Sequence, residues 1–144
     1  MDYFSDLAEE LAAVLLYGLV GIALLALGYL VMDLLTPGHL GRRLADDRNR
    51  NAGVIAASGL LAVGIVVTAA IAAAEGSLLR GLGQAAAYGV AGIVLQAIAF
   101  GVIDVITPGR LGESLMSEEG HEPLVYVTSA ALLAVGAVVA AAIS

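Results

Sequence analysis

Four long runs of apolar residues, separated by short polar segments, dominate the chain. The runs cover 11–32, 52–74, 81–103 and 124–144, and none contains a charged side chain. Each is close to the ~20 residues that an α-helix needs to cross the hydrocarbon layer of a bilayer. None shows the ten-residue alternation of polar and apolar residues that is typical of a membrane β-strand. The pattern predicts an all-α membrane protein with four transmembrane helices.

The second half of the chain repeats the first at a spacing of 71 residues. The motif Asp-x-x-Thr-Pro-Gly closes the first run at 33–38 and the third at 104–109; its residues are Asp33, Thr36, Pro37, Gly38, Asp104, Thr107, Pro108 and Gly109. We expect a single membrane domain over 1–144, made of two-helix repeats at 11–74 and 82–144. A repeat with an even number of spans keeps its orientation, so the two copies should be parallel and not inverted.

Small residues recur in the runs at spacings that bring them onto one helix face. Two copies of Tyr-Gly-x-x-Gly begin at Tyr17 and Tyr88, and the small residues of the second run recur in the fourth if one extra residue is allowed in the second loop. Such faces let helices approach closely in lipid, so we expect packing surfaces. The two tyrosines are expected to be interface or packing residues. The small residues are Gly18, Gly21, Gly64, Thr68, Ala72, Gly89, Gly92, Gly136 and Ala140.

Composition also favours a lipid environment. Of the 144 residues, 60% are hydrophobic and 13% are charged, which is outside the usual balance of a soluble domain. The first run is too long for a cleaved signal peptide and no Lys or Arg precedes it, so we expect it to remain in the mature protein. Without Cys there is no disulfide or thiolate chemistry, and the net charge of -7 does not suggest a nucleic-acid partner.

The distribution of Arg predicts the orientation. Five Arg residues follow the first and third runs, and one, Arg80, follows the second. Because Lys and Arg are retained on the cytoplasmic side, the Thr-Pro-Gly segments should be cytoplasmic and both termini should lie outside. Each segment starts like a short helix, with Thr as N-cap and Pro in the first helical position. We call 38–50 and 110–122 the arms, and we expect them to lie on the inner leaflet.

Charges at equivalent positions of the two arms are opposite. The repeat aligns Arg42 with Glu113 and Arg48 with Glu119. One interpretation is that the arms pair, either within one chain or head-to-tail between the copies of a homo-oligomeric ring. The other is that they are solvated loops, because an exposed ion pair is typically worth less than ~1 kcal/mol. The sequence leaves both open.

Asp33 and Asp104 are the most informative single positions. A carboxylate at the C-terminal end of a helix opposes the helix dipole, and near hydrocarbon it loses solvation as well. One interpretation is that the two carboxylates bind a cation or proton at the inner mouth of a pathway. The other is that each fixes the angle between its span and its arm through hydrogen bonds or an Arg side chain.

Other polar residues point to packing and not to catalysis. Gln96, in the middle of the third run, is expected to bond to another helix. The hydroxyls of Ser58, Thr68, Thr128 and Ser129 can bond back to their own helices. His39 and His121 have no further ligands at a recognisable spacing, so we predict no metal site. Without a nucleophile–base pair or a cofactor motif, we expect neither a cofactor nor an enzyme.

The doubled Asp-x-x-Thr-Pro-Gly, with Tyr-Gly-x-x-Gly earlier in the same span, resembles a family of small bacterial inner-membrane proteins described as a domain of unknown function, family 350. The resemblance covers nearly the whole chain and implies four spans in two similar halves, in a bacterial or archaeal cytoplasmic membrane. Some relatives are encoded beside enzymes of polyamine or glutathionylspermidine type, which implies a soluble cytoplasmic partner. The acidic second arm and the lack of Lys depart from the family.

Two functions follow as hypotheses. The first is a homo-oligomer that lines a channel- or transporter-like path for ions or small solutes, with Asp33 and Asp104 near its cytoplasmic mouth. Four short spans enclose little space, so such a path should lie between copies. The alternative is a non-conducting membrane scaffold whose arms recruit a cytoplasmic enzyme.

Overall fold

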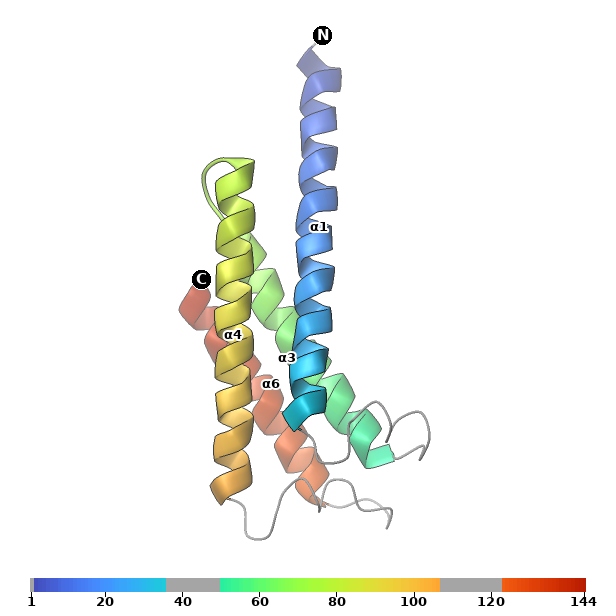
Figure 1. Ribbon diagram of the computed structural model, residues 1–144, viewed down its shortest axis with the longest axis vertical. Helices are drawn as coiled ribbons and strands as arrows, with labels where there is room; N and C mark the ends of the chain where they lie inside the picture. Colours follow the sequence, from blue (N-terminus) through green and yellow to red (C-terminus); the bar gives the residue numbers. More distant parts are fainter. Residues whose placement is uncertain (1, 36–49, 107–122) are drawn as a thin grey trace.

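A computed structural model describes residues 2–35, 50–106 and 123–144, and these segments are helical over nearly all their length (Figure 1). The helices are α1 (Asp2–Leu35), α3 (Arg50–Ala72), α4 (Leu78–Ile106) and α6 (Pro123–Ile143). All four are long and apolar enough to cross a membrane. The prediction of an all-α protein with four membrane-spanning helices is confirmed.

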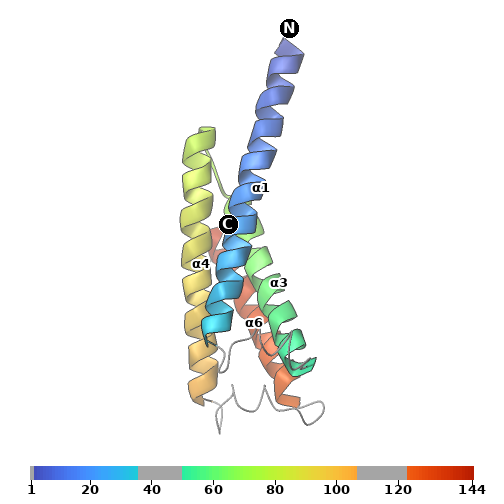
Figure 2. The ribbon, with the colours of Figure 1, turned by 45° about the vertical axis from the view of Figure 1, so that its right-hand side comes forward.

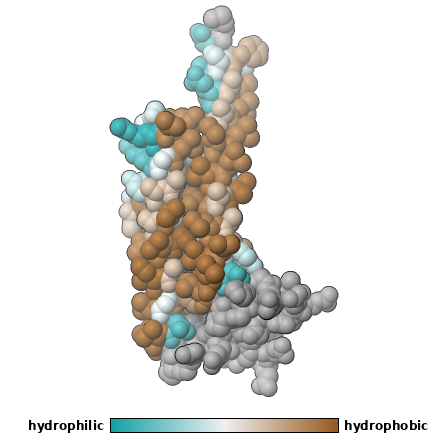
Figure 3. All heavy atoms as spheres, viewed as in Figure 1, coloured by the Kyte–Doolittle hydropathy of each residue, from teal (hydrophilic) through white to brown (hydrophobic). Residues whose placement is uncertain are grey.

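α1 is longer than the predicted span because it includes the acidic residues before the apolar run. Its 34 residues begin at Asp2, and at 1.5 Å per residue they extend about 50 Å, against ~30 Å of hydrocarbon. Carboxylates in the first turns interact favourably with the positive end of the helix dipole. The N-terminal turns of α1 project past the other helices (Figure 1) and carry both polar and apolar side chains (Figure 3).

α1 and α4 run side by side on one face of the bundle, and α3 and α6 cross behind them in the opposite direction (Figures 1 and 2). We call the end where α1 and α4 finish, and α3 and α6 begin, the arm end. α3 is the central helix: it packs against each of the other three and most extensively against α6. Both termini lie at the other end, which follows from four alternating spans.

Glycine sets how closely α6 and α4 approach their neighbours. A Cβ on Gly136 of α6 would lie 2.9 Å from both Cα and Cβ of Ala62 in α3. On α4, the hydrogen of Gly92 faces Val66 of α3 and also Val139 of α6. Three helices therefore meet around these two glycines. This is how small residues bring helices together in lipid, where van der Waals contact is a main driving force.

α1 and α4 are displaced along their length relative to each other. Leu24 of α1 lies against Gly89 of α4, and Tyr17 of α1 lies against Gly81. The spacings within these pairs are 65 and 64 residues, whereas the sequence repeat would place each residue beside the one 71 positions later. The glycines cause the displacement, because each leaves a hollow that receives a large side chain of α1. The offset is about 10 Å at 1.5 Å per residue, and α4 extends further toward the arm end (Figure 1).

Two apolar clusters fill the bundle. The one nearer the arm end joins all four helices and consists of Met32, Ala52, Ile55, Ala56, Phe100, Val125 and Leu132. The one further from the arms joins α1, α3 and α4 and consists of Leu24, Val63, Val67 and Ile93. The outer surface is apolar as well, with a continuous belt of hydrophobic residues between more polar ends (Figure 3). A hydrophobic surface of this extent belongs in lipid.

A tight turn joins α3 to α4. Gly76 has φ of 86°, a left-handed conformation that glycine adopts without the steric cost of a Cβ. The Ser77 hydroxyl accepts a 3.4 Å hydrogen bond from the Arg80 N–H, as an N-cap does. The Gln84 side chain returns to the turn, where its Oε1 accepts a 2.9 Å bond from the Glu75 N–H. These bonds fix the start of α4, and with it the position of Gly81 beside Tyr17.

Candidate functional site

Gln96 is the deepest polar side chain of α4. It is 2% exposed, and its Nε2 donates a 2.9 Å hydrogen bond to the backbone carbonyl of Leu132 in α6. The Leu132 carbonyl lies inside α6. It therefore accepts the Gln96 bond in addition to the backbone hydrogen bonding of the helix. The amide thus links α4 to α6 within the apolar part of the bundle, where an interhelical bond contributes on the order of 1 kcal/mol.

Three buried polar atoms of α4 and α6 have no hydrogen-bond partner within the described segments. They are Gln96 Oε1, Thr128 Oγ1 and Ser129 Oγ. Thr128 and Ser129 lie one turn before Leu132 on α6, at 1% and 8% exposure. The expected return of hydroxyl bonds to the same helix is present for Ser58, which donates to Val54 O at 2.8 Å, and for Thr68, which donates to Gly64 O at 2.8 Å. Sequence alone gave no sign that the α6 hydroxyls would differ.

These unpaired atoms are polar groups inside an apolar bundle. Two are hydroxyls of α6, which can both donate and accept, and one is an amide oxygen of α4, which can only accept. Leaving such atoms unpaired in an apolar environment costs free energy. Asn51, at the start of α3, is a further buried polar side chain that the sequence did not single out.

Asp33 and Asp104 occupy the last turns of α1 and α4, and both are half-buried. They are on the same end of the bundle, as the sequence predicts. They are not at the same level, however, because α1 is displaced by six to seven residues relative to α4. Asp104 is therefore about 10 Å nearer the arm end than Asp33. Within one chain the structure does not bring the two carboxylates into one site.

The remaining predicted positions lie outside the described residues. This applies to the Thr-Pro-Gly residues, to the arm charges and to both histidines, so their interactions stay predictions: Thr36, Pro37, Gly38, His39, Arg42, Arg48, Thr107, Pro108, Gly109, Glu113, Glu119 and His121. Over 2–35, 50–106 and 123–144, no three His, Cys, Asp or Glu side chains gather as metal ligands would.

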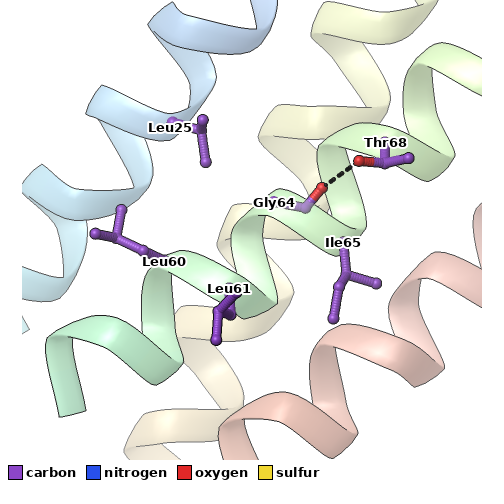
Figure 4. Close-up of a pocket in the computed structure, with 6 residues that line it drawn as sticks. All are labelled: Leu25, Leu60, Leu61, Gly64, Ile65 and Thr68. Atoms are coloured by element: carbon purple, nitrogen blue, oxygen red, sulfur yellow. Dashed lines mark hydrogen bonds between the residues drawn. The ribbon is translucent and has the colours of Figure 1, made fainter. Parts of the chain in front are cut away.

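An apolar groove of about 580 Å³ runs along the outside of the bundle between α1 and α3 (Figure 4). Leu25 of α1 forms one wall. The other wall and the floor come from α3, through Leu60, Leu61, Gly64, Ile65 and Thr68. The Thr68 hydroxyl is turned back to Gly64 O, so the groove presents almost only carbon. Part of the small-residue face predicted for the second run thus remains open in a single chain.

Comparison with known proteins agrees with this membrane architecture. The chain is 43% identical over 140 residues to a UPF0719 transmembrane protein of Mycobacterium bovis, covering 97% of this chain and 91% of that protein. It is 38% identical over 132 residues to a UPF0719 transmembrane protein of Mycolicibacterium paratuberculosis, covering 92% and 87%. No solved structure matches the chain. The model of the family described as Domain of Unknown Function (DUF350) matches residues 6–143. The chain is therefore a multi-pass membrane protein that belongs to the DUF350 family.

Proposed function

We propose that the protein forms a homo-oligomeric path for ions or small solutes, and that this role is non-catalytic. The observation that carries the proposal is the half-buried position of Asp33 and Asp104 at the arm ends of two membrane-spanning helices. An ionisable group that is partly buried in a membrane protein is costly, and such groups commonly mark ion or proton pathways.

The proposed path lies between copies of the chain and not along the axis of one. At the arm end, each bundle is filled by the apolar cluster that includes Phe100, Leu132 and Ile55. The two carboxylates lie at different levels, and copies in one membrane share these levels, so Asp33 and Asp104 would act at two successive points of such a path.

Flux through proteoliposomes tests the proposal. The wild type is compared with the Asp33→Asn, Asp104→Asn double variant, which keeps the side-chain shape and removes both charges. Asp6→Asn is the matched control, because Asp6 is an exposed carboxylate on the same α1 helix. We expect cation or proton flux from the wild type and from the control, and its loss in the double variant. No flux from the wild type across the common cations would refute the path, and equal flux in all three proteins would refute the role of Asp33 and Asp104 in it.

We also propose that the arm end faces the cytoplasm and that both termini lie outside, on the grounds of the Arg distribution. Since the chain has no Cys, single cysteines can report the orientation to a membrane-impermeant maleimide. The exposed positions Ser5 and Ser77 should be labelled on intact cells and Arg50 only after lysis. The reverse pattern would invert the proposed topology. Recruitment of a cytoplasmic enzyme depends on the arms and stays a prediction from the sequence.

A further inference from the structure

α3 and α6 contain nearly the same twelve-residue segment. Residues 60–71 of α3 read LLAVGIVVTAAI, and residues 132–143 of α6 read LLAVGAVVAAAI. The two segments differ only where α3 has Ile65 and Thr68 and α6 has Ala137 and Ala140. Equal sequences would be expected to bury equal faces, so any difference in burial comes from the way the helices are packed.

The two segments bury different faces, which overlap only at the equivalent residues Val67 and Val139. In α3 the buried face contains Ala62 and Val66, at 0% and 1% exposure. Their equivalents in α6 are Ala134, which is exposed, and Val138, which is 69% exposed. The reverse holds for the face that contains Gly64 in α3 and Gly136 in α6, which we call the glycine face. In α6 Gly136 is buried together with Leu132, whereas in α3 the equivalent residues line the open groove.

The contact between α3 and α6 explains this difference. We call the face that contains Ala62 in α3 and Ala134 in α6 the alanine face. The glycine face of α6 packs on the alanine face of α3, where Gly136 meets Ala62. Two nearly equal segments are therefore joined through unlike faces. This contact uses only one of the two faces on each segment. The glycine face of α3 and the alanine face of α6 therefore remain without a counterpart. Between separate molecules such a contact is called heterologous, and it continues from copy to copy.

The groove in the first half of the chain has a filled counterpart in the second. α1 and α3 pack through Gly21 and Val67, and α4 and α6 pack through the equivalent pair, Gly92 and Val139. In the second half, the space beside this pair is occupied by α3, which packs against both α4 and α6. In the first half, the equivalent space is the groove between α1 and α3. The molecule thus shows what kind of element fits there: a helix with an Ala-x-x-x-Val face, running parallel to α3.

We propose that the groove between α1 and α3 binds α6 of a second copy of this chain. The docked helix presents Ala134 of the second copy to Gly64, repeating the contact of Ala62 with Gly136. All the α3 and α6 helices run in one direction, as a shared membrane requires. The copies then associate head-to-tail, in a closed ring or an open row. This inference rests on the proposed function in supposing that copies assemble, but its test reads proximity and not flux.

Disulfide cross-linking between separately tagged single-cysteine chains tests the docking. One turn beyond the contact of Gly64 with Ala134, the parallel direction of the two helices should bring Thr68 of one copy beside Val138 of the next. Chains with Thr68→Cys and Val138→Cys are therefore co-expressed and oxidised in native membranes, where a disulfide needs Cβ atoms within about 4.5 Å. The control pairs Thr68→Cys with Val90→Cys, an exposed α4 residue near the level of Gly92. We expect the mixed dimer from the first pair alone, and equal yields from both pairs would overturn the docking.

A second variant makes the test independent of thiol chemistry. Gly64→Leu fills the groove, and we expect it to lower the association constant in nanodiscs by about tenfold or more, because overpacking a close helix contact is destabilising. Gly18→Leu is the matched control, since a Cβ there would meet nothing within 4 Å. Association unchanged by Gly64→Leu would overturn the proposal and leave the groove to lipid acyl chains. Cross-linked protein that carries no flux would refute the path and retain the interface.

Discussion

Replacing Gly136 by Ala tests a contact in which one helix packs directly against the backbone of another. The added Cβ would lie 2.9 Å from Cα and Cβ of Ala62 and 3.0 Å from its carbonyl oxygen. Carbon atoms pack best at ~3.5–4.0 Å, so α3 and α6 would have to separate by roughly 0.5–1 Å at this point. Two of the three atoms belong to the backbone of α3 and cannot rotate away. Any relief must therefore come from movement of a whole helix.

The expected cost follows from that separation. A gap of ~0.5–1 Å forfeits about a quarter to a half of the attraction between the atoms that line it. α3 and α6 form the most extensive helix pair in the bundle, and overpacked cores typically lose ~1–3 kcal/mol. We expect Gly136→Ala to lower the free energy of unfolding by about 2 kcal/mol. Gly89→Ala should cost less, because the added Cβ would meet the mobile end of the Leu24 side chain.

Unfolding by SDS in mixed detergent micelles, followed by far-ultraviolet circular dichroism, measures this difference. Gly18→Ala is the control, because a Cβ at this exposed position of α1 would meet nothing within 4 Å. Both variants add the same methyl group to a membrane-spanning helix, so their difference isolates the contact with Ala62. Free energies of unfolding that agree within about 0.5 kcal/mol, the usual range of neutral surface changes, would refute the reasoning.

Three further predictions use the same unfolding measurement. Gln96→Leu should cost about 1 kcal/mol or less, because loss of the bond to the Leu132 carbonyl is offset by removal of the unpaired Oε1; a loss above ~2 kcal/mol would indicate an essential amide. Gly81→Ala should cost less in a Tyr17→Phe background, with a coupling of about 0.5–1 kcal/mol, because the added Cβ meets the tyrosine hydroxyl; additive costs would contradict this. Asp104→Asn should be less destabilising than Asp104→Ala, because an amide can keep the hydrogen bonds of a turn; equal losses would argue against a turn-fixing role.

The number and type of the helices could be predicted from the sequence, because they depend on local composition. Each uncharged run is long enough to cross the bilayer, and lipid requires that the backbone satisfy its hydrogen bonds within the run. The start of α1 at Asp2, nine residues before the apolar run, was not predicted. Helix formation continues into these N-terminal turns because the acidic residues there interact favourably with the helix dipole.

The candidate site was predicted only in part. Gln96 was correctly expected to bond to another helix, since an amide in lipid needs a partner. The unpaired hydroxyls of Thr128 and Ser129 were not predicted, because a hydroxyl in a helix can usually return a bond to its own backbone. Nor could the different levels of Asp33 and Asp104 be predicted, because an exact repeat places equivalent residues at equal depth.

By itself, the sequence determined that this chain is a four-helix membrane protein with polar groups at Gln96 and at the ends of two spans. These features are local: they follow from the length, polarity and spacing of residues along each run. Only the tertiary structure decided which face of each helix is buried. The nearly identical segments at 60–71 and 132–143 bury different faces, because Gly136 fits against Ala62 while the equivalent Gly64 faces an open groove. Which face of a helix is buried depends on the helices that pack beside it, and the sequence of one helix alone does not specify those neighbours.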